Sequence, residues 1–235
     1  MIFRTACREA LGAPALAMAA TFLAFGAAVQ AVGLGLGWAL ASALLVYGMP
    51  GQMVLVTAVA TPGGALPAVL GAATANARFL PMAVALTPWL GKSKLRWLAL
   101  PFIAVTPWAM AMRRLPGLPP EHRLGWFLGF GLTSWLVAGG ATIIGHVIAP
   151  FLQAWMLAAL LFVNPLYFAL ILAGETRAAP SRRAVIGGLC ATPLVLLLPP
   201  AWALLAAGVV GGTLAFLWGQ FLSGQSVSGQ AIDRR

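Results

Sequence analysis

The sequence predicts an all-α fold, a polytopic transmembrane helical bundle, from three observations. Of the 235 residues, 61% are hydrophobic and only 8% are charged, with a mean hydropathy of +0.95; soluble domains carry about 25% charged residues. The charges are gathered between long uncharged blocks. The short segments between these blocks are basic.

The uncharged blocks set the number of membrane segments. Arg78 is the one charge between residues 10 and 91, and no Asp, Glu, Lys or Arg occurs in 124–174 or 184–232. Because a bilayer span needs about 20 apolar residues, these blocks hold about three, two and two spans. Residues 97–112 add a short or tilted one. We therefore expect about seven or eight segments, some of them broken or re-entrant.

The net charge of +10 is better explained by membrane topology than by nucleic-acid binding, because the basic residues flank the apolar blocks. Loops rich in Lys and Arg remain on the cytoplasmic side. This predicts a multi-pass protein of the bacterial cytoplasmic (inner) membrane, with the lipid bilayer and no nucleic acid as partner. Lys92, Lys94 and Arg96 spoil the pattern, because three simple spans would put them outside. Either an early segment is re-entrant or this loop breaks the rule.

Glycine and proline interrupt two apolar segments. One break is predicted at Gly48, Pro50 and Gly51, and another at Pro165; a turn is predicted at 61–64. In lipid, a broken helix survives only where protein or a water-lined cavity satisfies the freed backbone groups. We therefore expect both broken segments to lie against protein or a water-lined cavity.

The chain is predicted to form a single transmembrane domain, 1–222, followed by a polar, disordered tail, 223–235. Residues 21–26 weakly echo 125–131, and the Asn76-to-Phe79 spacing returns in Asn164 and Tyr167. Such weak symmetry is typical of transporters built from repeats. It suggests two unequal repeats, 10–112 and 124–222, although the offsets of the two matches differ and chance is the other interpretation.

Arg78 is the main candidate for a functional side chain, because a charge within a membrane segment is costly and usually marks a functional or paired site. A planar guanidinium suits bidentate contact with a substrate carboxylate. The structural alternative is that Arg78 snorkels or bonds to helix-end carbonyls. Uncharged polar residues beside Arg78 or the breaks complete the predicted substrate-binding set: Gln52, Asn76, Asn164 and Tyr167.

The residues needed for catalysis are scarce. The four acids are Glu9, Glu121, Glu175 and Asp233, and all of them flank the apolar blocks. We find no paired carboxylates, metal-ligand spacing or nucleotide-binding loop, so we expect no enzyme activity, no metal and no cofactor.

Several motifs, taken in order, resemble the AzlC-type branched-chain amino acid exporters. They are Pro14, Phe25-Gly26, Gly48-x-x-Gly51-Gln52, Asn76-x-Arg78, Leu86-x-Pro88 and the Trp135-containing run 132–145. The resemblance covers roughly residues 3–219 and implies a helical exporter subunit for small hydrophobic amino acids. It also implies a small four-span AzlD-like membrane partner, and its motif positions fall on Gln52, Asn76 and Arg78.

The sequence departs from that family at two positions. Phe79 stands where the family has His after its Asn-x-Arg motif, and Thr106-Pro107-Trp108 stands where it has Thr-Asp-Glu. Without those acids, a substrate ammonium group has no evident carboxylate partner. Backbone carbonyls at a broken helix are one replacement, and a small carboxylate as the substrate is another.

The first functional hypothesis is therefore transport, by export, of small hydrophobic amino acids or related small carboxylates. The alternative is a non-transporting membrane scaffold subunit. An ATP-driven permease stays open, because a separate ATPase subunit would leave no mark in this chain. An integral membrane enzyme is the weakest reading.

Overall fold

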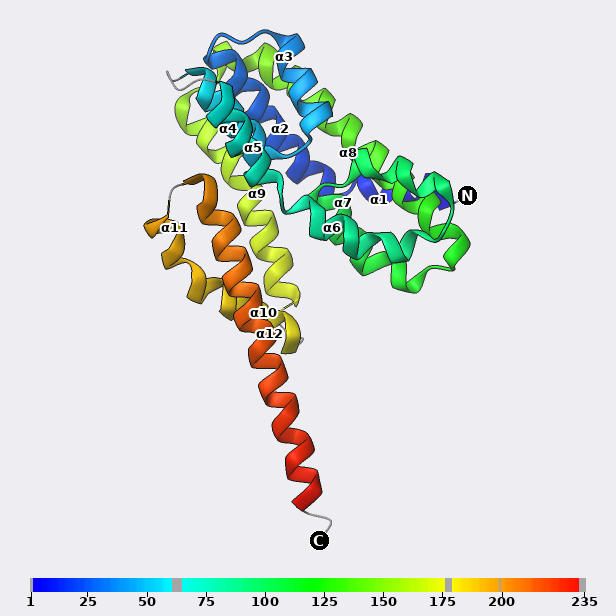
Figure 1. Cartoon of the computed structure of the whole chain (residues 1–235). Coiled ribbons are helices and arrows are strands. Elements are labelled where there is room, and N and C mark those ends of the chain that lie inside the picture. Colours follow the sequence, from blue (N-terminus) through cyan, green and yellow to red (C-terminus); the bar gives the residue numbers. More distant parts are fainter. Residues whose placement is uncertain (1, 61–64, 176–178, 199, 233–235) are drawn as a thin grey trace. The chain divides into compact units, whose positions relative to one another are not determined.

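The computed structural model describes residues 2–60, 65–175, 179–198 and 200–232, and every element within them is helical (Figure 1). The predicted turn at 61–64 lies outside the described residues. The longer α-helices are α1 (Ile2–Ala10), α2 (Ala13–Ala31), α4 (Met49–Ala60), α5 (Ala65–Asn76), α6 (Phe79–Leu86), α7 (Val105–Arg114), α8 (Pro120–Ile148), α9 (Ala154–Glu175), α10 (Ala179–Ala191) and α12 (Pro200–Ile232). The predicted all-α class is confirmed.

Shorter elements connect these helices. They are α3 (Leu36–Ala41), the π-helix η1 (Ser42–Val46), the 3-10 helices η2 (Thr87–Leu90), η3 (Lys94–Phe102), η4 (Leu115–Gly117) and η5 (Ala149–Phe151), and α11 (Pro193–Leu197). The chain divides into two compact units, Met1–Leu166 and Tyr167–Arg235, with the boundary inside α9. We describe each unit by itself.

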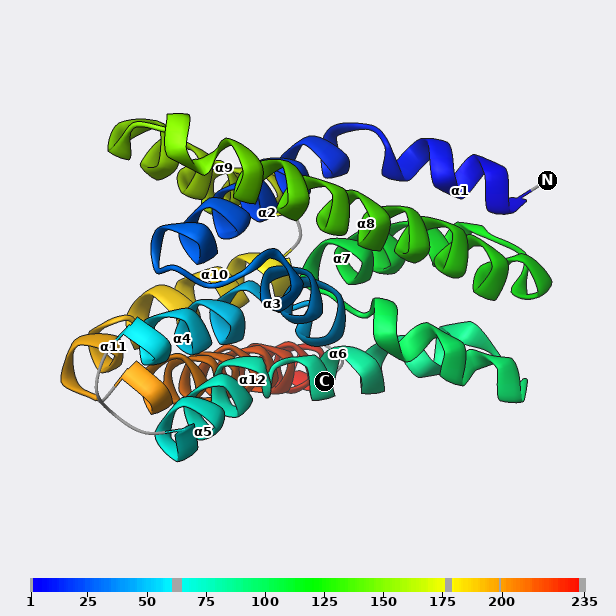
Figure 2. The ribbon, with the colours of Figure 1, turned by 90° about the horizontal axis from the view of Figure 1, so that it is seen from above.

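Helix α8 is the central element of the first unit. Its 29 residues extend about 44 Å at 1.5 Å per residue, longer than the roughly 30 Å of bilayer hydrocarbon. Helix α1 packs beside its N-terminal half and α2 beside its C-terminal half (Figure 2). A Cβ on Gly129 would meet the backbone of Phe3, and one on Gly26 would meet the backbone of Thr142. These glycines let the helices approach closely.

The first unit has two apolar cores, one along each half of α8. The first gathers Trp126, Phe127 and Phe130 of α8 with buried residues of α1, η2, η3 and α7. The second surrounds the C-terminal half of α8 with α2, α3, η1 and α4. The buried residues of α8 therefore extend from Trp126 to Gly145.

In the second unit, α10 and α12 pack through small residues. A Cβ on Gly187 or on Gly211 would collide with the backbone of the other helix. Helix α12 runs to Ile232 and so includes most of the segment for which the composition predicts disorder. The predicted domain and repeat boundaries stay predictions.

Three stretches of the described residues are long and apolar enough to cross a membrane: Ala13–Ala31, Ala68–Leu90 and Pro120–Phe151. Shorter apolar helices cover Leu36–Val46 and Ala206–Phe221. Residues 97–112 differ from the predicted short span. They contain the end of η3, two extended residues and most of α7, whose ten residues reach only about 15 Å.

Candidate functional site

The first chain break lies between η1 and α4, in the segment where the sequence predicts one. The π-helix ends at Val46 and is followed by Tyr47, which has a left-handed backbone (φ 45°). Non-glycine residues rarely adopt this conformation, and it persists only where the surrounding structure holds it. Tyr47 is held by a ring stack on Phe22 and by its hydroxyl, which donates to Met18 Sδ at 3.8 Å.

Two side chains satisfy carbonyls that the π-helix frees. Gln52 Nε2 donates to the Ser42 carbonyl at 2.7 Å, and Trp135 Nε1 donates to the Leu44 carbonyl at 2.9 Å. A helix break away from water needs such replacements, because an unsatisfied buried backbone group is costly. Gln52, fully buried in the first turn of α4, thus holds the break together.

The second break separates α5 from α6 at Ala77 and Arg78. The two breaks lie against each other. A Cβ on Gly48 would meet Asn76 Oδ1 at 2.5 Å and the Phe79 ring at 2.7 Å, and a Cβ on Gly51 would collide with the Asn76 amide. Both glycines are therefore needed for the side chain of Asn76 to rest on the start of α4.

Several polar atoms around these breaks are buried and have no hydrogen-bond partner in the described part of the chain. They are Ser42 Oγ, Gln52 Oε1, Asn76 Oδ1 and Arg78 Nε. The Arg78 guanidinium lies 5.6 Å from the centre of the Phe79 ring. Phe79, which stands where the family pattern has His, thus offers the cation an aromatic face, a favourable contact where water is scarce.

Contacts with α8 show the height of the first break. At the C-terminal end of α8, His146 Nε2 donates to the Leu34 carbonyl at 3.0 Å. Further along the chain, Leu44 packs on Gly139 and accepts from Trp135, which lies beside the midpoint of α8. The chain therefore runs from one end of α8 to its middle before it breaks.

A second segment reaches the same height from the other end of α8. Phe102, at the end of η3, lies against Gly131 and meets the Trp135 ring edge-on at 6.1 Å. Helix α7 then returns, and Arg114 at its end pairs with Glu9 at 3.0 Å. Residues 94–114 thus form a hairpin that enters and leaves at the N-terminal end of α8.

The basic loop that spoiled the charge pattern lies at this same end of α8. The Arg123 guanidinium lies 5.1 Å from the centre of the Trp89 ring, just before Lys92. Glu9 also accepts from Trp126 Nε1 at 2.9 Å, which holds the end of α1 at this same end of α8. Because segment 94–114 follows Lys92, its turning back leaves both alternatives for the loop, an early re-entrant segment or an exception to the rule, as predictions.

Of the other predicted site residues, Asn164 has a side chain outside those that the structure describes, and its place in the site stays a prediction. Helix α9 continues through Asn164 and Pro165, so the structure has helix where the sequence predicts an interruption. A proline inside a membrane helix removes one backbone hydrogen bond, and neighbouring groups can replace it without ending the helix. Tyr167 falls in the second unit.

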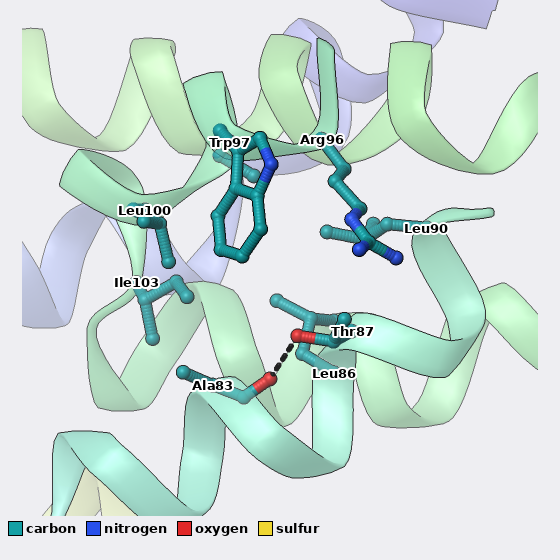
Figure 3. Close-up of a pocket in the computed structure, with 9 residues that line it drawn as sticks. Ala83, Leu86, Thr87, Leu90, Arg96, Trp97, Leu100 and Ile103 are labelled. Atoms are coloured by element: carbon teal, nitrogen blue, oxygen red, sulfur yellow. Dashed lines mark hydrogen bonds between the residues drawn. The ribbon is translucent and has the colours of Figure 1, made fainter. Parts of the chain in front are cut away.

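A small pocket lies apart from these breaks, between η3 and the end of α6 (Figure 3). Its volume of about 10 Å³ is close to what one water requires. Trp97 faces it from η3, and the Thr87 hydroxyl beside it donates to the Ala83 carbonyl. The remaining lining residues are Leu86, Leu90, Arg96, Ala99, Leu100 and Ile103. The pocket has no room for an organic substrate.

Four residues of the site escaped the sequence reasoning: Ser42, Phe79, Phe102 and Trp135. A tryptophan in an apolar run most often faces lipid or packs in the core. The sequence around Trp135 therefore does not indicate that its side chain bonds to a broken helix. Phe79 carried a usable signal, because it follows Arg78 directly. The described residues hold no group of three or more His, Cys, Asp or Glu side chains that could bind a metal ion.

Long apolar helices, two breaks at mid-height of the central helix and buried polar atoms beside them define an integral membrane protein of the transporter class. Comparison with protein families agrees. The family described as AzlC protein matches residues 14–152, more than half of the chain. The chain therefore belongs to the AzlC family, a transporter family associated with branched-chain amino acid transport. No curated protein and no solved structure matches significantly.

Proposed function

We propose that this protein exports small hydrophobic amino acids or related small carboxylates across the bacterial cytoplasmic membrane. The observation that carries the proposal is the meeting of two chain breaks at mid-height of α8, with Arg78 and Asn76 in one and Gly48, Gly51 and Gln52 in the other. Transporters with discontinuous helices bind substrate at such breaks near the middle of the bilayer.

The substrate carboxylate is the group that Arg78 would bind. Its Nε is buried and has no partner among the described residues, so the guanidinium has a donor to offer. Helix α6 begins directly after Arg78. The N-terminus of a helix attracts negative charge, because its first N–H groups are unpaired and its dipole is positive there. The buried Arg78 Nε and the start of α6 both favour an anionic group at this place.

The remaining polar atoms fit the other end of an amino acid. Gln52 Oε1 and Asn76 Oδ1 lie at the two breaks and have no partner among the residues that the structure describes, so they can replace the acidic element that the sequence lacks. The export direction and a small four-span AzlD-like partner rest on membership of the family. We propose this chain as the large subunit of such a pair.

A membrane scaffold subunit is the second candidate, and the free Arg78 Nε is also what favours it, because a carboxylate of a partner protein could pair with Arg78 in place of a substrate. The scaffold would carry no flux even with its partner present.

Counterflow of labelled leucine into proteoliposomes tests the proposal, with the four-span partner co-reconstituted. Wild type should exchange leucine, and Arg78→Met should lose at least about tenfold in flux, because a charge-assisted bond to the carboxylate is removed. Arg96→Met is the matched control: Arg96 also lies over the following aromatic ring, at 5.1 Å from Trp97, and its Nε is also buried without a partner among the described residues, but it belongs to η3 and not to the two breaks. Unchanged flux in Arg78→Met would refute its assigned role, and absence of flux in wild type would favour the scaffold.

A further inference from the structure

Three buried oxygens at the first break lack a hydrogen-bond partner in the part of the chain that the structure describes: Ser42 Oγ, Gln52 Oε1 and Asn76 Oδ1. Gln52 is fully buried and Ser42 is 7% exposed. The Gln52 amide orientation follows from its bond, because the Ser42 carbonyl can only accept and so must face Nε2. The oxygen of that amide is therefore the unused end.

The three residues that carry these oxygens are linked by contacts around Gly48. Gln52 bonds to the backbone of Ser42, and its own N–H donates to the Gly48 carbonyl at 3.0 Å. Asn76 rests on Gly48 and Gly51. Positions 48, 51 and 52 share one face of a helix, because residues three and four apart are neighbours on its surface.

A ligand for this neighbourhood must supply positive charge or several N–H donors. An unsatisfied buried acceptor is costly, so a cluster of them indicates a group that pairs with it. Uncharged oxygens and carbonyls at unwound helices are the ligands that sodium takes in transporters, and an ammonium group bonds to the same atoms. The Gln52 oxygen can only accept, and the Ser42 hydroxyl and Asn76 amide can each present an oxygen to the same ligand, so a cation here would complement an anion at Arg78.

We propose that Ser42, Gln52 and Asn76 form a binding site for a monovalent cation, either the ammonium group of the transported amino acid or a sodium ion. The proposal rests on the proposed function, since the site adjoins the substrate carboxylate position. It extends that function by assigning the positive end of the substrate, or the coupling ion, to oxygens without a carboxylate.

Thermal unfolding of the purified full-length protein gives the direct test. The midpoint is measured in sodium chloride, methylammonium chloride and choline chloride at equal ionic strength. Sodium or methylammonium should raise the midpoint above its value in choline, which is too large for the site. Ser42→Ala and Gln52→Leu should each weaken the apparent cation affinity by about tenfold. Ser42→Ala is a small change that keeps the test valid if Gln52→Leu folds poorly.

Two ligands then separate the two sources of the cation. If the ammonium group occupies the site, leucine binds at least about tenfold more tightly than 4-methylpentanoate, which lacks it, and the difference shrinks in both variants. If sodium occupies the site, both compounds bind with an affinity that rises with sodium, and the variants shift the sodium dependence. Gln30→Leu, the same substitution at a half-buried position of α2, should change neither result.

The proposal is overturned if wild type responds to neither cation and both variants keep the preference for leucine over 4-methylpentanoate. Stabilisation by sodium without binding or transport of either compound would instead contradict the proposed function while the cation site stands. The two failures are therefore distinguishable.

Discussion

At the scale of single residues, the site depends on two glycines, because any side chain at their positions would fill the space beside them. Gly48 and Gly51 leave the space that the Asn76 amide occupies, and this contact joins the two chain breaks. Small residues at helical spacing are common in membrane proteins and mostly serve packing. Here the contact is with a polar side chain whose Oδ1 has no other partner among the described residues, which gives these glycines a role beyond close packing.

Gly51→Ala should therefore destabilise the protein. The new Cβ would collide with the Asn76 amide, and overpacking of this kind costs about 1–3 kcal/mol. Gly37→Ala is the matched control, because nothing lies within 4 Å of a Cβ there and alanine favours the helix. The thermal unfolding midpoints of both variants decide the matter. Equal midpoints would mean that Asn76 does not rest on Gly51.

At the scale of elements, α8 carries partners at three heights. Near its N-terminal end, Arg123 contacts Trp89 and Trp126 bonds to Glu9. In its middle, Trp135 contacts both Leu44 and Phe102. Near its C-terminal end, His146 bonds to Leu34. The segment η3–α7 consequently turns back at Phe102. We therefore expect Lys92 and Arg114 on the same side of the membrane, the side that basic loops favour.

Cysteine labelling in oriented vesicles tests this arrangement, in a background where Cys7 and Cys190 are replaced by serine. Lys92→Cys and Arg114→Cys should react with a membrane-impermeant maleimide from the same, cytoplasmic side. Val32→Cys, in the exposed loop near the other end of α8, should react from the opposite side. Labelling of Lys92→Cys together with Val32→Cys would show that 97–112 crosses the bilayer after all.

At the scale of the whole chain, the apolar blocks and basic loops were enough to predict an all-α membrane protein, because hydrophobicity and charge act locally along the sequence. The break at Tyr47 and Gly48 was also readable, since glycine and proline mark it. The helix through Pro165 was not, because tertiary and membrane context decides whether a proline ends a helix.

The site could be predicted from the sequence only in part, because tertiary contacts decide which residues meet. Gln52, Asn76 and Arg78 stand out in sequence as polar residues in apolar runs, but their mutual contacts depend on how two breaks fold against each other. Trp135 joins Leu44 across 91 positions of sequence, and no local pattern predicts such a pairing. The family match, 14–152, lies wholly within the first unit, which contains both breaks and α8.

The selectivity of Arg78→Met between leucine and leucinamide tests the central claim, that Arg78 at the meeting of the two breaks binds the substrate carboxylate. Leucinamide keeps the ammonium group and the side chain but has no carboxylate. Wild type should bind leucine at least about tenfold more tightly, and Arg78→Met should bind the two almost equally, because only the charge-assisted contact is lost. An Arg78→Met protein that keeps the full wild-type preference for leucine would contradict the account.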